Sequence, residues 1–98
     1  MQAYLAEFIG SFIFFTVILQ ATAKNANWPN LAPLLIVVGL LAGVTVAASG
    51  SGAHLNPAVS VMMLLNKSLP MNDFLPYVGA QLAGAVAAKM CADMLNRM

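Results

Sequence analysis

Charged side chains are scarce in this chain: four lysine and arginine residues and three acids are spread over 98 residues. Soluble domains carry roughly 25% charged residues, whereas the charged share here is 7% and hydrophobic residues make up 61%. This composition excludes an ordinary soluble domain, and a net charge of +1 offers no basic surface for nucleic acid. The sequence therefore predicts an integral membrane protein, located in the cell (inner or plasma) membrane.

Cysteine and histidine are almost absent as well, with one of each. Cys91 has no second cysteine with which to form a disulfide within the chain, and it is interpreted as a small apolar residue of a helix. His54 has no second His, Cys or acid at ligand spacing beside it, so it is a poor metal ligand. We expect no metal, no cofactor and no catalytic residue, and therefore no enzyme.

Long apolar runs are what the sequence has in abundance. Three of them reach the roughly 20 residues that cross a bilayer, at about residues 4–23, 31–49 and 72–96. Turn formers and Trp28 between the first two predict a short loop at the membrane surface. A polar linker at 66–70 precedes the third, which Asn72 and Asp73 are expected to cap and to complement in charge at its N-terminus.

A polar, glycine-rich segment interrupts these runs at residues 50–66. Its glycines and serines let the backbone turn, Asn56 is a good N-cap, and Pro57 suits the first position of a helix. The apolar stretch that follows is too short to span. A helix that begins at membrane depth directs unpaired N–H groups and its positive dipole end into the bilayer, which is tolerated where they line a wet cavity. The segment therefore predicts a re-entrant loop with a half-helix, and a pore.

Glu7 is an ionisable residue inside the first predicted spanning helix. Such residues are costly in a membrane and suggest a function. One hypothesis makes Glu7 the proton-carrying group of a small dual-topology proton-coupled transporter, a class that also assembles from short identical chains. This hypothesis explains nothing about residues 51–59, and it is the alternative to the channel.

The segment Ser51–Val59, SGAHLNPAV, resembles the first signature loop of the aquaporin and glycerol-facilitator family. Ala6-Glu7-Phe8 and Ala80–Ala85 resemble the family's pattern in the first and third helices, so the resemblance extends over essentially the whole chain. It covers only the N-terminal half of a family member, which has six spanning helices and two such loops. The implied fold is an all-α membrane unit, residues 1–98, of three transmembrane helices and one re-entrant half-helix, one half of an inverted repeat.

The resemblance implies a role for each residue of the loop. Asn56 becomes a donor in the pore, since its side-chain oxygen can cap a helix N–H while its NH₂ group faces a solute; a plain helix cap is the alternative. His54 either lines the pore, where a group that ordinarily titrates near neutral pH could make conduction pH-dependent, or is a satisfied structural histidine. Glu7 and Gln81 would support the loop. The implied pore and selectivity residues are Gly52, Ala53, His54, Leu55, Asn56, Pro57, Ala58, Val59 and Ile36.

Two of these positions depart from the family's pattern. The narrow filter of the family usually contains an arginine directly after the second Asn-Pro-Ala motif, and Val59 follows the motif here. The filter position on the second helix is the aliphatic Ile36. Without that cation, exclusion of protons depends more on the half-helix dipoles and Asn56. The expected solute is water or a small neutral molecule such as glycerol.

One half encloses no pore, so the resemblance implies self-association. We expect two copies to pair as an antiparallel dimer about an axis in the membrane plane, and four such pairs, hence eight chains, to form the particle within the lipid. Close helix contacts are expected at small residues, namely Gly39, Gly43, Ala80, Gly84 and Ala88. A non-conducting piece of an aquaporin is a further alternative, and the initial Met1 favours a short complete protein over it.

Lysine and arginine are almost balanced between the two ends of the predicted unit. Lys67 lies on the side of the N-terminus, and Lys24 and Arg97 lie on the other, where Lys89 joins them if it snorkels outward. Orientation in a membrane follows the bias of these residues in short loops, and a bias this small predicts insertion in both orientations.

Overall fold

The computed structural model describes residues 1–97, and this part of the chain consists of helices without β-strands. The elements are α1 (Ala3–Ala21), the 3-10 helix η1 (Pro29–Leu31), α2 (Ala32–Ser51), α3 (Pro57–Leu65) and α4 (Met71–Asn96). Two segments are long and apolar enough to cross a membrane, α1 and the continuous stretch Pro29–Ser51. The prediction of an all-helical protein is confirmed, and these two segments fit two of the three predicted spans; within residues 1–97 the predicted span at 72–96 is not among them.

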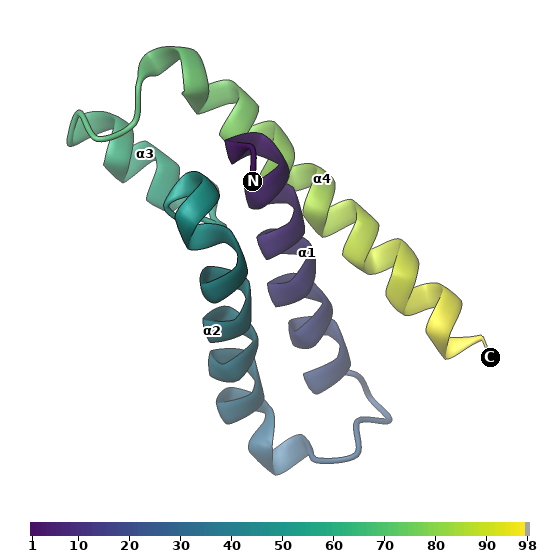
Figure 1. The fold of residues 1–98 in the computed structure, drawn as a ribbon. Coiled ribbons are helices and arrows are strands. Elements are labelled where there is room, and N and C mark those ends of the chain that lie inside the picture. Colours follow the sequence, from purple (N-terminus) through teal and green to yellow (C-terminus); the bar gives the residue numbers. More distant parts are fainter. Residues whose placement is uncertain (98) are drawn as a thin grey trace.

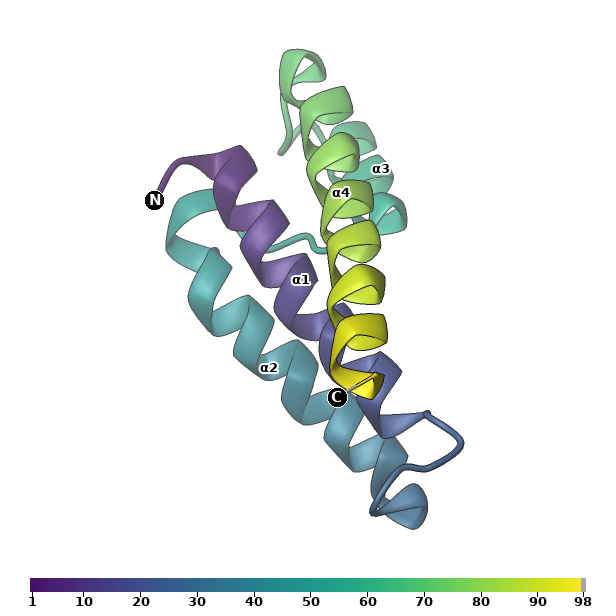
Figure 2. The same cartoon turned by 90° about the vertical axis from the view of Figure 1, so that its right-hand side faces the viewer.

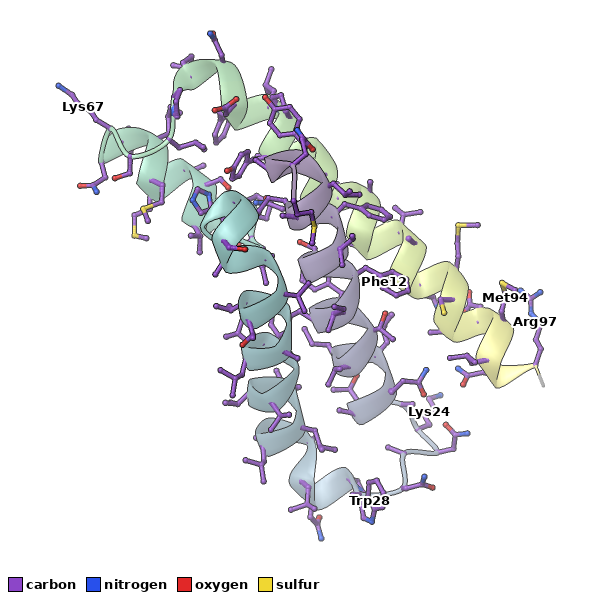
Figure 3. The ribbon with its side chains drawn as sticks, in the orientation of Figure 1. Phe12, Lys24, Trp28, Lys67, Met94 and Arg97 are labelled. Atoms are coloured by element: carbon purple, nitrogen blue, oxygen red, sulfur yellow. The ribbon has the colours of Figure 1, made fainter. Side chains whose placement is uncertain are left out.

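The helix α1 lies between α2 and α4 (Figure 1), and the view turned by 90° keeps this order (Figure 2). The chain descends along α1, returns along α2, and runs through α4 in the same direction as α1 (Figure 1). The linker after α3 therefore lies at the same end as the N-terminus. Lys24, Trp28 and Arg97 lie at the opposite end from Lys67 (Figure 3).

Glycines allow α1 to approach both of its neighbours closely. A Cβ on Gly43 of α2 would lie 2.7 Å from the carbonyl oxygen of Gly10, and one on Gly84 of α4 would lie 2.9 Å from Ser11 Cβ. Gly39 meets Val17 in the same way, at 2.7 Å. The close contacts expected of Gly39, Gly43 and Gly84 are therefore made within one chain, between α1 and its two neighbours.

The start of the loop differs from the prediction. The helix α2 continues through Gly50 and Ser51, so the loop begins at Gly52 rather than at residue 50. Gly52 has φ +83°, and its N–H donates to the carbonyl of Ala48, which is the left-handed arrangement that commonly ends a helix. The flexible Gly and Ser residues before it are simply the last turn of α2.

Both other predicted spans also shift slightly. The helix α1 ends at Ala21 instead of residue 23, and Thr22 turns its hydroxyl onto the carbonyl of Ile18 at 2.7 Å. The helix α4 begins at Met71, with Pro70 as its N-cap and no side-chain cap. Asp73 lies in the first turn of α4, where its charge complements the helix dipole as expected. The expected side-chain cap is wrong, because the Asp73 carboxylate instead accepts a hydrogen bond from the Tyr4 hydroxyl at 2.6 Å.

The short helix α3 has only nine residues, and it lies alongside α4. Figure 2 shows it beginning beside the middle of the molecule and rising towards the end where α4 starts. Its outer side is open: Val61, Met62 and Leu65 are 43%, 56% and 77% exposed. Large apolar side chains in this position need either lipid or another protein surface against them.

Candidate pore loop

The loop between α2 and α3 has an unusual backbone. Gly52, Ala53 and Leu55 all have positive φ, at 83°, 56° and 56°. Residues other than glycine are rarely held in this left-handed region, which costs on the order of 1–3 kcal/mol each unless the surroundings enforce it. Such strain in two nearby non-glycine residues indicates that the loop is held by strong contacts.

The first of these contacts is the side chain of Leu55, which is fully buried. It packs in the central core with Ala6 of α1 and Ala47 of α2. Its methyl groups lie where Gly10 and Gly43 leave room: a Cβ on Gly10 would be 2.7 Å from Leu55 Cδ2. The side chain of Leu55 therefore anchors the loop in the core instead of facing a pore.

Glu7 supplies the second contact, from the middle of the bundle. It is fully buried, and its Oε2 accepts from the backbone N–H of His54 at 3.0 Å and from the Ser51 hydroxyl at 2.5 Å. Its Oε1 accepts from the backbone N–H of Leu55 at 2.9 Å and from Gln81 Nε2 at 2.8 Å. Each carboxylate oxygen thus has two donors, which uses the acceptor capacity of an ionised carboxylate.

A series of hydrogen-bonded side chains continues from Glu7 to residues of α4 and α3. Gln81 also donates to Ser60 Oγ at 2.9 Å, and Ser60 Oγ lies 3.0 Å from His54 Nδ1. The ring of His54 packs against that of Tyr77, with 4.9 Å between the ring centroids, and the Tyr77 hydroxyl donates to the carbonyl of Ser51 at 2.8 Å. Residues from all four α-helices and the loop therefore join in one hydrogen-bonded group.

Asn56 stands at the N-terminus of α3. Its Oδ1 accepts from the Ala58 N–H at 2.8 Å, which leaves its NH₂ group without a protein partner among residues 1–97. Asn56 and Ala58 are exposed, whereas Pro57 and Val59 are half-buried. The exposed side of this turn thus carries one free amide donor at the positive end of a helix.

The structure brings together all but one of the residues singled out from the sequence. Ile36 lies on α2, 15 positions before Ser51 at the end of that helix, or about 22 Å away along its axis. Two cavities lie near the other end, one of about 430 Å³ beside Trp28 and one of about 350 Å³ beside Lys24. No cluster of His, Cys, Asp and Glu in this described part could hold a metal ion.

The sequence did not identify three members of the hydrogen-bonded group: Ser60, Tyr77, and Ser51 in its role as a hydrogen-bond donor to Glu7. The spacing could have indicated two of them. Tyr77 precedes Gln81 by four residues, and Ser60 follows Asn56 by four, so each lies on the same helix face as a residue that was singled out. Lone polar groups at that spacing in an apolar helix need buried partners.

These features define an integral membrane protein in which a buried acid holds a strained polar loop at the start of a short helix. The chain belongs to the major intrinsic protein family, whose family model matches residues 1–97. The relatives are named as aquaporins and glycerol uptake facilitators, so the resemblance to that family is confirmed. Proteins of this family are membrane channels rather than enzymes.

Similar proteins come from bacteria and mammals. Glycerol uptake facilitator protein-like 6 of Lactiplantibacillus plantarum is 39% identical over 90 residues, 90% of this chain and 41% of that protein. Aquaporin-2 of Ovis aries is 38% identical over 92 residues, 88% of the chain and 33% of that protein. Aquaporin Z of Bradyrhizobium diazoefficiens is 35% identical over 94 residues, 90% of the chain and 39% of that protein. The chain thus spans about a third to two fifths of these relatives, and no solved structure matches it significantly.

Proposed function

We propose that the chain is half of a passive channel for water or a small neutral solute such as glycerol, with the pore formed between two inverted copies. The observation that carries the proposal is Asn56: its oxygen caps α3, and its NH₂ group is exposed and unpaired within residues 1–97. An amide held in this way is an oriented donor to a passing solute. The carbonyls of Gly52, Ala53, His54 and Leu55 precede it as acceptors along the same loop.

In this proposal the unit comprises three spanning helices and one re-entrant half-helix. The third span is α4, whose 26 residues extend over about 39 Å. Its charged residues stand near its two ends, Asp73 at the start and Lys89 with Asp93 in the last turns, so the stretch between them is free of charge. The nine residues of α3 are too few to cross the membrane. In this proposal the loop after α2 enters the membrane, and α3 returns to the side from which the loop entered.

The bonding of Glu7 supports a structural role rather than proton transport. A carboxylate that carries protons has to exchange them with water or substrate, whereas Glu7 is 0% exposed and has four protein donors around it. Protonation would place a hydrogen among those donors and displace one of them. We therefore favour the brace over the proton-coupled transporter.

The open side of α3 supports a protein partner. Asn56 and the apolar residues Val61, Met62 and Leu65 lie on surfaces that nothing in the described chain covers. An inverted copy would bring two Asn56 amides and two positive helix ends face to face, which favours neutral solutes over cations. Four such pairs in the cell membrane form the complete particle in this proposal.

A flux measurement tests the channel. Vesicles that contain the protein are expected to shrink severalfold faster than empty vesicles after an osmotic step with water or glycerol as permeant, without ionic current. Asn56→Asp should change the permeability, because it replaces the free NH₂ donor by a second acceptor and adds a charge. Asn66→Asp, on the exposed linker end of α3, is the matched control and should behave as the unaltered chain.

Two results would contradict the proposal in different ways. Shrinkage equal to that of empty vesicles, together with a monomeric mass in mild detergent, would favour a non-conducting piece of an aquaporin. Uptake of a hydrophobic cation driven by a pH gradient, and abolished by Glu7→Gln, would favour the transporter.

A further inference from the structure

Ser60 lies at a point where the direction of each hydrogen bond can be worked out. The residue is fully buried on α3, and its Oγ contacts Gln81 Nε2 at 2.9 Å and His54 Nδ1 at 3.0 Å. The amide nitrogen of Gln81 can only donate, so Ser60 Oγ accepts there. The single hydrogen of the hydroxyl then has one acceptor among its recorded partners in residues 1–97, which is His54 Nδ1.

The orientation of the Gln81 amide is fixed by Glu7. In the opposite orientation, Gln81 Oε1 would face Glu7 Oε1 at hydrogen-bond distance, and two acceptors would oppose each other. The observed orientation leaves Gln81 Oε1 buried without a partner among residues 1–97. That unsatisfied oxygen is tolerated because the nitrogen bonds both Glu7 and Ser60.

We propose that Ser60 is a positioning residue that holds His54 as a neutral ring with its proton on Nε2. If Nδ1 carried the proton, it would donate to Ser60 Oγ, and the buried Ser60 hydrogen would have no acceptor. The ring of Tyr77, tilted by 49° to the imidazole with 4.9 Å between the ring centroids, restrains rotation of the imidazole. The Nε2–H is directed away from Ser60, and it has no partner among the hydrogen bonds of residues 1–97.

The consequence for permeation rests on the proposed function. His54 is half-buried, and its Nε2–H is a second oriented, uncharged donor on the loop, before the amide of Asn56. A solute that passes both needs acceptor lone pairs, as water and polyols have. The inference thus assigns to Ser60, through His54, a preference for neutral oxygen-bearing solutes.

The single histidine of the chain makes the test direct. The full chain is labelled with ring-¹⁵N histidine in detergent micelles, and both nitrogen resonances then belong to His54. At a pH where the ring is neutral, we expect Nδ1 to be unprotonated and hydrogen-bonded, and Nε2 to carry the proton. Ser60→Ala should remove the hydrogen-bond shift at Nδ1 and lower the ratio of the Nε2–H to the Nδ1–H tautomer by about fivefold, which corresponds to a bond of about 1 kcal/mol.

Two further variants complete the experiment. Ser60→Thr keeps the hydroxyl and should keep the tautomer, and Ser68→Ala removes an exposed serine of the linker and should leave both resonances unchanged. A proton on Nδ1 in the unaltered chain overturns the inference, and so does an Nδ1 shift that is the same in the Ser60→Ala variant as in the unaltered chain. The first of these results is decisive even if Ser60→Ala fails to fold.

Flux measurements separate the two proposals. If the channel exists, Ser60→Ala should lower glycerol permeability severalfold while Ser60→Thr retains most of it. Absence of flux in the unaltered chain, with the expected Nε2–H resonance, would refute the channel and leave the role of Ser60 in place.

Discussion

At the scale of single residues, the loop depends on Glu7, which lies outside it on α1. Ala53 and Leu55 adopt left-handed backbone conformations that are unfavourable for them, and these are compensated by the bonds to one buried carboxylate and by burial of the Leu55 side chain. Removing the carboxylate should therefore release the loop rather than merely weaken one contact.

The first prediction concerns Glu7→Gln. The new amide has one acceptor oxygen in place of two, and its NH₂ group faces donors, so two donors lose their hydrogen bond to residue 7. Each such loss costs about 1–3 kcal/mol, so the free energy of unfolding should fall by about 2–6 kcal/mol. Reversible unfolding by SDS in mixed micelles, followed by circular dichroism, measures this change.

Asp93→Asn is the matched control, since it makes the same carboxylate-to-amide change at an exposed ion pair. The Lys89 and Asp93 side chains are 64% and 40% exposed, so the control should cost no more than about 0.5 kcal/mol. If the two variants unfold alike, the four bonds of Glu7 do not hold the loop.

At the scale of the elements, the position of α1 between α2 and α4 depends on glycines that have different tasks. Gly43 faces the backbone of Gly10, where a Cβ would lie 2.7 Å from a carbonyl oxygen that cannot move independently. Gly79, on the exposed side of α4, has nothing within 4 Å of such a Cβ. The same substitution at the two positions should therefore have opposite signs.

We expect Gly43→Ala to lower the free energy of unfolding by about 1–3 kcal/mol, because α1 and α2 must move apart to accommodate the methyl group. Gly79→Ala should raise it by up to about 1 kcal/mol, because alanine loses less backbone entropy in a helix. The same SDS titration measures both changes. Equal destabilisation by both variants would contradict the assignment of a close packing contact to Gly43 and of open space to Gly79.

At the scale of the whole molecule, the apolar runs and the Asn56-Pro57 start of α3 were predictable, because length, hydrophobicity and capping are local properties. The Gly39 and Gly43 pattern predicted a close helix contact, but periodicity does not say which helix supplies the partner. The hydrogen bonds that connect Glu7, Gln81 and Ser60 could not be predicted for a similar reason. The bonded residues are 21 and 74 positions apart, and only the folded chain brings them together. The pairing of Asp73 with Tyr4 escaped prediction for the same cause.

The distribution of cations over the whole molecule leads to the last prediction. Lys67 stands at one end of the helices, and Lys24 and Arg97 stand at the other (Figure 3). Lys89 lies within α4, paired with Asp93 at 2.7 Å, and it joins Lys24 and Arg97 if its side chain snorkels outward. Orientation follows the lysine and arginine bias of short loops, and a difference of one or two residues is too small to impose one orientation. We therefore expect the chain to insert both ways, as an inverted pair of identical chains requires.

Cysteine labelling on intact cells measures this directly. In a Cys91→Ser background, a single cysteine is placed at Asn27, exposed in the loop before η1, or at Ser68, exposed in the linker before α4. An impermeant reagent should label each site partially, since each faces outward in only some of the molecules. Adding two lysines beside Ser68 should place the linker in the cytoplasm. Labelling at Asn27→Cys should then become complete, and labelling at Ser68→Cys should be lost. Solute flux through such a uniformly oriented chain should decrease, because inverted pairs can no longer form. Full labelling of one site and none of the other in the unaltered background would rule out dual topology, and with it a pore between inverted copies.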